Sequence, residues 1–255
     1  KAVFAAAAVI CVIAVVAIFA FLIYKSIPAF GKLGVFRFMF GDNWSPDRLD
    51  TYDSPLSGTY GILTMIVGTL TATVGALLVG GVLGYFTAIF LAFYCPPAPR
   101  RVLSAVINLL AGIPSVVYGL VGMIVLVPLI RTTFSLGSGA CLLAAILVLS
   151  IMVLPSIINV SETALRAVPR EYEEASLALG ATATETYFRV SLHAARSGVA
   201  TAVVLGVGRA IGEAMAIIMV AGNVANMPGL FQSVRFLTTG IISGMSSAPV
   251  GSLYQ

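Results

Sequence analysis

Two ionisable side chains of opposite charge, Arg209 and Glu213, lie near the middle of an apolar stretch, residues 197–222. The stretch is long enough to cross a bilayer, for which about 20 apolar residues suffice. A charge at mid-membrane costs about 2.5–3.5 kcal/mol on insertion scales and usually faces a protein interior or a polar path. Side chains four residues apart on a helix lie on one face and can pair. We therefore predict that Arg209 and Glu213 form the functional centre of the chain.

The chemistry that suits this pair is the binding of an oxyanion. Arginine stays charged and presents a planar fork of donors to phosphate oxygens. A carboxylate repels an anion, but it can accept a hydrogen bond from the O–H that phosphate keeps at neutral pH and that sulfate lacks. We hypothesise that Glu213 neutralises Arg209 at rest, and that Arg209 contacts an arriving phosphate while Glu213 accepts its hydrogen bond. The simpler alternative is an ion pair that only fixes helix packing.

The composition places these residues in an integral membrane protein. The chain is 59% hydrophobic and 9% charged, with a mean hydropathy of +1.05, whereas soluble chains carry about 25% charged residues. No basic run suggests a nucleic-acid partner. The three cysteines are scattered and His193 is the only histidine, so neither a metal site nor another cofactor is predicted.

The apolar segments predict an all-α fold, a polytopic bundle of transmembrane helices. Five crossings are expected, at residues 2–24, 60–94, 102–130, 140–160 and 197–222. The second would be about 50 Å long as a straight helix, so we expect it to tilt or to bend at Gly80–Gly81. Pro114 interrupts the third crossing and is expected to kink it. Because the chain begins at Lys1, we also expect residues upstream of it to be missing.

These segments divide the chain into three parts. Residues 1–27 form an N-terminal transmembrane helix, residues 28–58 an extracytoplasmic loop, and residues 59–255 a permease core that includes a cytoplasmic loop at 161–196. The orientation follows from lysine and arginine near the membrane ends. Arg100 and Arg101 in one short loop outnumber Arg131 in the next, which places the amino terminus in the cytoplasm.

The cytoplasmic loop has the local pattern of two helices joined at a glycine. Pro169 and the acids after it suit the first turn of a helix, and Gly180 is a natural C-terminal stop. Thr182 and Glu185 have the spacing of a capping box that starts the second helix. On the first helix, Tyr172, Ala175 and Leu179 make a short apolar face that could dock on a partner.

The same loop carries a spaced motif: Glu174-Ala175-Ser176, three residues, Gly180, nine residues, then Val190-Ser191-Leu192-His193. This pattern resembles the "EAA" loop of ABC-type import permeases, with Ser176 for the second alanine and His193 for the usual proline. In that family the loop seats in a groove of the ATP-hydrolysing subunit. The resemblance implies that the residues coupling this chain to the ATPase are Glu174, Ala175, Ser176 and Gly180, with Tyr172 and Leu179. The chain has no phosphate-binding G-x-x-x-x-G-K-[ST] loop of its own, so we expect no enzymatic activity here.

Three further motifs are similar to those of phosphate-specific transport permeases, more to the C-type subunit (PstC) than to its A-type partner. They are G-R-A-I-G-E-A-M-A at 208–216 with A-G-N at 221–223, A-G-I-P-S-V-V-Y-G at 111–119, and F-G-D-N-W-S-P at 40–46. The resemblance implies an ABC type I importer permease in the cell inner membrane, forming half of a phosphate path. Its implied partners are an ATP-binding subunit as a homodimer, a second homologous permease, an extracytoplasmic phosphate-binding protein and membrane lipid. Such permeases have six helices or more, so we expect a sixth to start near Gly251 and the C-terminal end to be missing.

Three other functions stay open. The importer could carry another oxyanion, such as sulfate or molybdate. An ion-coupled secondary transporter would need an internal inverted repeat and more than one buried acid, and the sequence shows neither. A membrane enzyme such as a lipid phosphatase would need a nucleophile and base cluster, which a single histidine does not supply.

Overall fold

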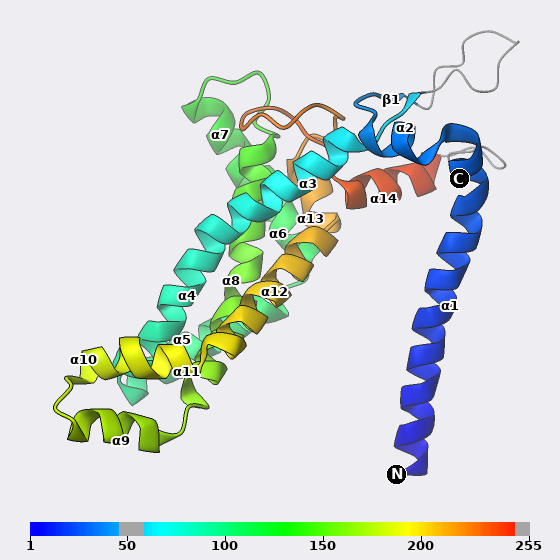
Figure 1. Ribbon diagram of the computed structural model, residues 1–255. Coiled ribbons are helices and arrows are strands. Elements are labelled where there is room, and N and C mark those ends of the chain that lie inside the picture. Colours follow the sequence, from blue (N-terminus) through cyan, green and yellow to red (C-terminus); the bar gives the residue numbers. More distant parts are fainter. Residues whose placement is uncertain (46–58, 248–255) are drawn as a thin grey trace, which may run out of the picture. The chain divides into compact units, whose positions relative to one another are not determined.

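A computed structural model describes residues 1–45 and 59–247 of the chain (Figure 1). The chain divides into two compact units, one before Thr64 and one spanning Thr64–Ser246. The expected sixth helix near Gly251, and Pro46 at the end of the 40–46 motif, lie outside the described residues.

The first unit contains the N-terminal helix. Helix α1 covers Ala2–Leu33, and its part from Ala2 to Pro28 is apolar and long enough to span a membrane. Gly34, with φ of 76°, turns the chain into helix α2, Val35–Phe40. Strands β1 (Trp44–Ser45) and β2 (Thr59–Tyr60) then pair antiparallel, and the rings of Trp44 and Tyr60 meet edge to face at 6.0 Å.

The second unit begins with a continuous helical run, Leu63–Tyr94. Its parts are α3 (Leu63–Ala76), the π-helical η1 (Leu77–Gly81), α4 (Val82–Ile89) and the π-helical η2 (Phe90–Tyr94). At Gly80–Gly81, where the sequence predicts a bend, the structure has the wider π-helical turn η1 within one continuous span. A Cβ at Gly80 would overlap the carbonyl oxygen of Ser150, so this glycine allows close packing of two helix backbones.

The prediction of one kinked crossing at 102–130 was wrong. Helix α5 (Pro97–Gly112) ends before Pro114, and a separate span, Ser115–Thr133, follows as α6 (Ser115–Val121), η3 (Gly122–Leu126) and α7 (Val127–Thr133). The reason is local: Ile113 is extended, with φ of −71° and ψ of 128°, the conformation that a following proline favours.

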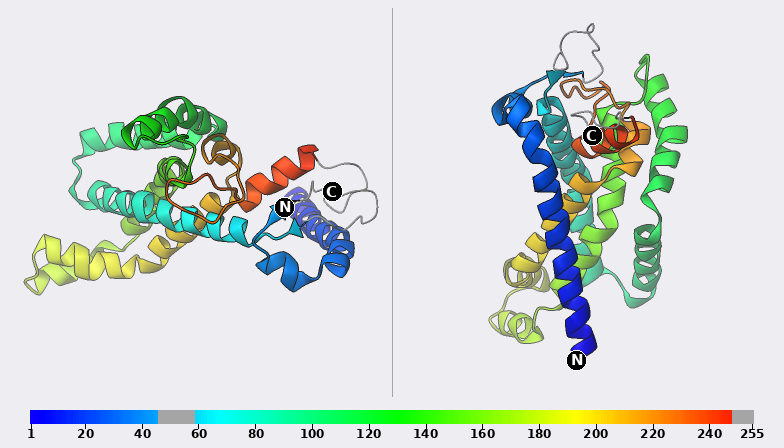
Figure 2. Two further views of the ribbon diagram at one scale, coloured as in Figure 1. Left: turned by 90° about the horizontal axis from the view of Figure 1, so that it is seen from above. Right: turned by 90° about the vertical axis from the view of Figure 1, so that its right-hand side faces the viewer.

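Helix α8, Leu142–Arg166, is the centre of the second unit. Its most apolar stretch is 61% buried, against 33% or less in the other three candidate spans, and Figure 2 shows it among the helices of this unit. Its core residues include Leu149, Met152 and Ile157. The helix continues through Arg166, so its last turn falls within the range 161–196 assigned above to the loop.

The rest of the unit forms the projecting loop and the C-terminal helices. The elements are α9 (Arg170–Ala178), α10 (Ala183–Thr186), η4 (Tyr187–Ser191), α11 (Leu192–Ala194), α12 (Arg196–Gly212), α13 (Met215–Val220) and α14 (Leu237–Ser247). Among the described residues four helices can span a membrane by length and composition, or five if α12 and the segment before it, bent by 66°, count as one. Helix α14 was not expected from the sequence.

Candidate functional site

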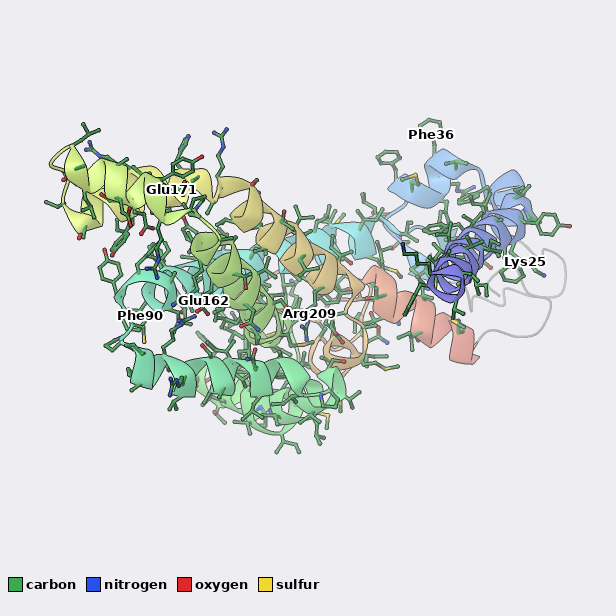
Figure 3. All side chains as sticks on the ribbon, turned by 90° about the horizontal axis from the view of Figure 1, so that it is seen from below. Lys25, Phe36, Phe90, Glu162, Glu171 and Arg209 are labelled. Carbon is green, nitrogen blue, oxygen red and sulfur yellow. The ribbon has the colours of Figure 1, made fainter. Side chains whose placement is uncertain are left out.

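Arg209 lies in the last turn of α12, with a partly buried side chain. Its Nη1 donates a hydrogen bond to the hydroxyl oxygen of Ser156 on α8, at 2.9 Å. Seen from below, Arg209 lies within the helices of the second unit, whereas Glu171 lies out on the projecting loop (Figure 3). The predicted functional arginine is therefore inside the helical body and has a neutral partner.

Glu213 does not continue the helix that carries Arg209. Helix α12 ends at Gly212, and Glu213 is extended, with φ of −72° and ψ of 131°. Its Oε1 accepts a hydrogen bond from the backbone N–H of Ala216 at 3.0 Å, and its carbonyl oxygen accepts one from Thr238 at 2.8 Å. The carboxylate thus satisfies one of the free N–H groups in the first turn of α13.

The predicted continuous helix over 197–222, and the ion pair within it, were therefore wrong. Among the described residues, all ion pairs are made by Glu162, and neither Arg209 nor Glu213 takes part in one. The physical reason is the helix break after Gly212, which removes the four-residue spacing on one face. The second carboxylate oxygen of Glu213 has no hydrogen-bond partner within the described part of the chain.

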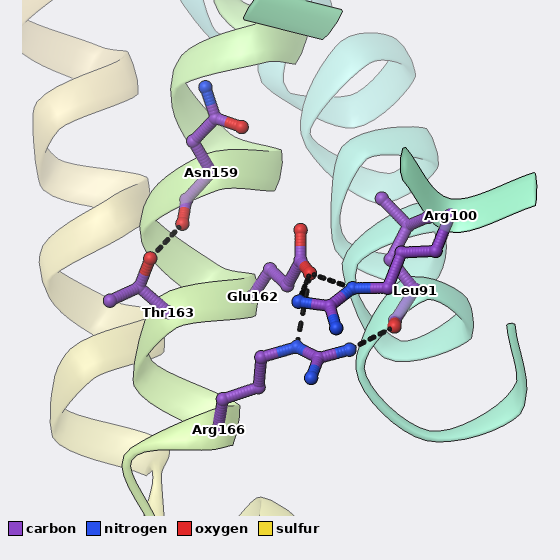
Figure 4. Close-up of polar contacts among 6 residues, drawn as sticks. All are labelled: Leu91, Arg100, Asn159, Glu162, Thr163 and Arg166. Atoms are coloured by element: carbon purple, nitrogen blue, oxygen red, sulfur yellow. Dashed lines mark hydrogen bonds and ion pairs between the residues drawn. The ribbon is translucent and has the colours of Figure 1, made fainter. Parts of the chain in front are cut away.

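A charged cluster at the loop end of α8 was missed by the sequence analysis (Figure 4). Glu162 is 8% exposed, and its Oε1 accepts from Arg100 Nη2 at 2.9 Å and from Arg166 Nε at 3.1 Å. Arg166 also donates to the carbonyl oxygen of Leu91 at 2.7 Å. The cluster therefore ties α8 to α5 and η2. The spacing of Glu162 and Arg166, four residues apart, could have predicted half of it.

The projecting loop has the helix–glycine–helix form that the sequence predicts (Figures 1 and 2). Gly180 has φ of +89°. Its N–H bonds to the carbonyl of Leu177, and the N–H of Ala181 bonds to that of Ser176, which together make a Schellman motif. Pro169 lies one residue before the helix rather than in its first turn.

The second helix of the loop starts with the predicted capping box. The backbone N–H and the hydroxyl of Thr182 both donate to Glu185, at 3.0 and 2.9 Å. These bonds favour the charged carboxylate and lower the pKa of Glu185, the backbone bond having the larger effect. His193 lies at the end of this helical segment, with its Nε2 3.4 Å from Arg196 Nη1.

Some side chains of the projecting loop are hydrogen-bonded within the loop, and others are exposed. The hydroxyls of Ser176 and Thr186 lie 2.9 Å apart, and Ser191 donates to Glu173 at 2.7 Å, which fixes α9 against the second helix. The exposed set comprises Tyr172, Glu174, Ala175, Leu179 and Gly180. Leu179 is 90% exposed, although it is apolar.

The family is shown by a match over two thirds of the chain. Residues 80–251 match the model of the binding-protein-dependent transport system inner membrane component. The chain belongs to this family. It is therefore a permease subunit of an ABC importer, a multi-pass component of the inner membrane, and not the subunit that hydrolyses ATP.

Individual relatives agree with this membership. The probable ABC transporter permease protein YqgH of Bacillus subtilis is 41% identical, over 97% of this chain and 79% of the relative. The phosphate transport system permease protein PstC of Mesorhizobium japonicum is 31% identical over 91% and 72%. That of Haemophilus influenzae is 34% identical over 78% and 70%. Membership of this family implies that the permease works with a separate ATPase, a binding protein and a partner permease.

A solved structure has the same fold. A chain from the MetNI methionine ABC transporter, in inward-facing conformations, matches 76% of this permease and 82% of its own length, with a TM-score of 0.52 and 21% identity. This agrees with the predicted all-helical bundle of the ABC type I importer kind.

Proposed function

We propose that this permease forms half of the translocation path of an ATP-driven phosphate importer. Relatives named as phosphate transport permeases, at 31–37% identity, support phosphate as the substrate. The observation that carries the proposal is the state of Arg209. It is a cation within the helical body whose partner is a serine hydroxyl and not a carboxylate.

This partner leaves the charge of Arg209 available to a substrate. The guanidinium makes a single hydrogen bond to the neutral hydroxyl of Ser156, a bond with one charged partner that contributes about 1.5–3 kcal/mol net. A phosphate adds a second charge and can accept two parallel bonds from the guanidinium. Phosphate, with charge and several acceptor oxygens, can therefore compete for the guanidinium that Ser156 holds. Glu213 contributes its free carboxylate oxygen, which accepts the phosphate O–H, so the two residues act together on the substrate without pairing at rest.

The energy enters through the projecting loop. Its exposed residues Tyr172, Glu174 and Leu179 dock on the ATP-binding subunit, which we expect to be a homodimer. Ser176 holds α9 to the helix that leads into α12, so a push on α9 reaches Arg209 through continuous structure. The other half of the path comes from a second, homologous permease, and an extracytoplasmic phosphate-binding protein delivers the substrate.

The test is uptake of labelled phosphate by the whole complex in proteoliposomes, with ATP inside. Arg209→Lys loses the planar fork and Glu213→Gln loses the anionic acceptor, so each is expected to lower uptake about tenfold or more. Arg131→Lys, at an exposed site on α7, is the matched control and should transport normally. Normal uptake in both site variants would refute the proposal.

Another oxyanion remains the alternative, since the name of the YqgH relative gives no substrate. Competition by unlabelled sulfate or molybdate separates these substrates, because only phosphate offers an O–H to Glu213. Family membership favours ATP over an ion gradient as the energy source. Uptake that survives ATP depletion but stops when the proton gradient collapses would reverse that conclusion.

A further inference from the structure

A strip of uncharged polar side chains runs along α8 from Arg209 toward the Glu162 cluster. Ser156, Asn159 and Thr163 are spaced three and four residues apart, so they lie on one side of the helix. The strip continues the site: Ser156 is the partner of Arg209, and Arg166 in the Glu162 cluster follows one turn after Thr163. Ten residues of helix separate Ser156 from Arg166, which is about 15 Å.

Helix α5 adds a second side to the strip. Asn159 Nδ2 donates to Asn108 Oδ1 at 3.0 Å, and Asn108 is exposed on α5. Asn108 lies in a helix whose neighbouring side chains, Val106 and Leu109, are apolar and exposed. An amide in such surroundings is costly unless it has a polar partner.

Two donors of the strip are unused. The Nδ2 of Asn108 donates to no acceptor among the residues that the structure describes. Ser156 uses its oxygen to accept from Arg209, and its own O–H has no acceptor in the same set. Both donors lie in or beside a helix apolar enough to span a membrane, where unsatisfied polar groups call for water or a substrate.

We propose that Ser156 and the Asn108–Asn159 pair form a second, uncharged station for the transported oxyanion, between Arg209 and the Glu162 cluster. This inference rests on the proposed function and extends it toward the cytoplasm. Neutral donors replace part of the hydration shell of the anion without holding it as tightly as a second guanidinium would. Transport needs this balance, because a site on a path must bind well enough to admit the ion and weakly enough to release it.

The charges at the two ends of the strip fit an anion path. Arg209 is one cation at the start. At the other end Arg100 and Arg166 share the single carboxylate of Glu162, so the cluster keeps one net positive charge. An anion that leaves Arg209 therefore meets donors without charge and then a cationic end.

The competing explanation is that the two asparagines only hold α5 against α8, as polar residues often do between membrane helices. The variant Asn108→Asp distinguishes this explanation from the proposed station. Its carboxylate still accepts from Asn159 Nδ2, so the helix contact is kept. It also removes the free N–H donor and places a negative charge on the path.

The experiment measures phosphate uptake and basal ATPase of the whole complex in proteoliposomes at pH 8, where the new carboxylate is ionised. We expect Asn108→Asp to lower uptake about tenfold or more through charge repulsion, with complex assembly and basal ATPase unchanged. Thr71→Val is the matched control, since the hydroxyl of this exposed threonine on α3 donates to the carbonyl oxygen of Val67 in its own helix. It should transport as wild type does.

Ser156→Ala is the second variant and decides the matter if Asn108→Asp does not assemble. It removes one donor of the station and should slow uptake about threefold. If Asn108→Asp assembles and transports phosphate as well as the Thr71→Val control does, the station is overturned while the proposed function stays intact. If Asn108→Asp does not assemble, control-level uptake by Ser156→Ala has the same meaning. A wild-type complex that imports no phosphate refutes the proposed function itself, and the station with it.

Discussion

The two sites where arginines meet α8 treat their charge in opposite ways. At the Glu162 cluster, a nearly buried carboxylate accepts from Arg100 and Arg166. At the other site, Arg209 donates to the neutral hydroxyl of Ser156 and makes no ion pair among the residues that the structure describes. A carboxylate between two arginines fixes helices together and cancels about half of their attraction for a passing anion. An arginine with a neutral partner keeps that attraction, which is what a transport path requires.

The acidic residues of the two sites differ in the same sense. Glu162 forms ion pairs with side chains from two helices. Glu213 bonds a backbone N–H at a helix break, which holds it in place without cancelling Arg209. The role of a charge in a membrane helix must therefore be assigned from its partner, because its position in the sequence does not distinguish a structural role from a functional one.

The largest effect is expected from Glu162→Gln, which should lower the free energy of unfolding. The change leaves Arg100 and Arg166 facing each other without a carboxylate. Removing one partner of a fully buried pair costs about 3–5 kcal/mol, and because both arginines are about a third exposed, we expect about 2–3 kcal/mol.

Thermal and denaturant unfolding of the purified complex measures this loss. Glu171→Gln, at an exposed carboxylate in the first turn of α9, is the control and should change stability by about 0.5 kcal/mol or less. Equal stability of the two variants would show that the cluster does not hold the helices.

The next effect comes from making the Arg209 site resemble the Glu162 cluster. Ser156→Asp gives Arg209 a carboxylate partner at the position where the hydroxyl lies. We expect phosphate uptake to fall about tenfold, because the substrate then competes with a fixed anion, while stability stays within about 1 kcal/mol of wild type. Ser156→Asn, of the same size but uncharged, is the control. Uptake reduced equally in both would mean that size, and not charge, limits the path.

Much of the fold follows from patterns that depend on short stretches of sequence. Long apolar runs predict the helices at Ala2–Pro28, Leu63–Tyr94 and Leu142–Arg166, since any span must satisfy its backbone internally. The Gly180 corner and the Thr182 cap follow from local backbone chemistry. These features need no knowledge of what packs against them.

The parts that failed depend on distant partners. The break after Gly212 looks like continuous helix in sequence, and it is supported by Thr238 on α14, which bonds the carbonyl of Glu213. Ser156 and Asn108 look like isolated polar residues until the fold brings them beside Arg209 and Asn159. The sequence therefore shows which charged residues lie in the apolar segments but not how they pair, because pairing depends on contacts between helices. That Arg209 and Glu213 form the functional site stays a prediction.

The smallest effect on uptake is expected from a substitution in the projecting loop. Unlike the two arginine sites, this loop is held in shape by its backbone conformation and not by charge. Gly180 has φ of +89°, and a Cβ there would meet nothing within 4 Å. Gly180→Ala therefore costs only the strain of the left-handed conformation, about 1 kcal/mol, and should lower ATP-driven uptake a few-fold by loosening α9. Gly180→Asn, which tolerates this conformation better, should recover most of the uptake. If the alanine and asparagine variants lower uptake equally, the cause is a steric contact between the new side chain and the ATPase. The conformation of the projecting loop would then be set by the partner subunit and not by the backbone of Gly180.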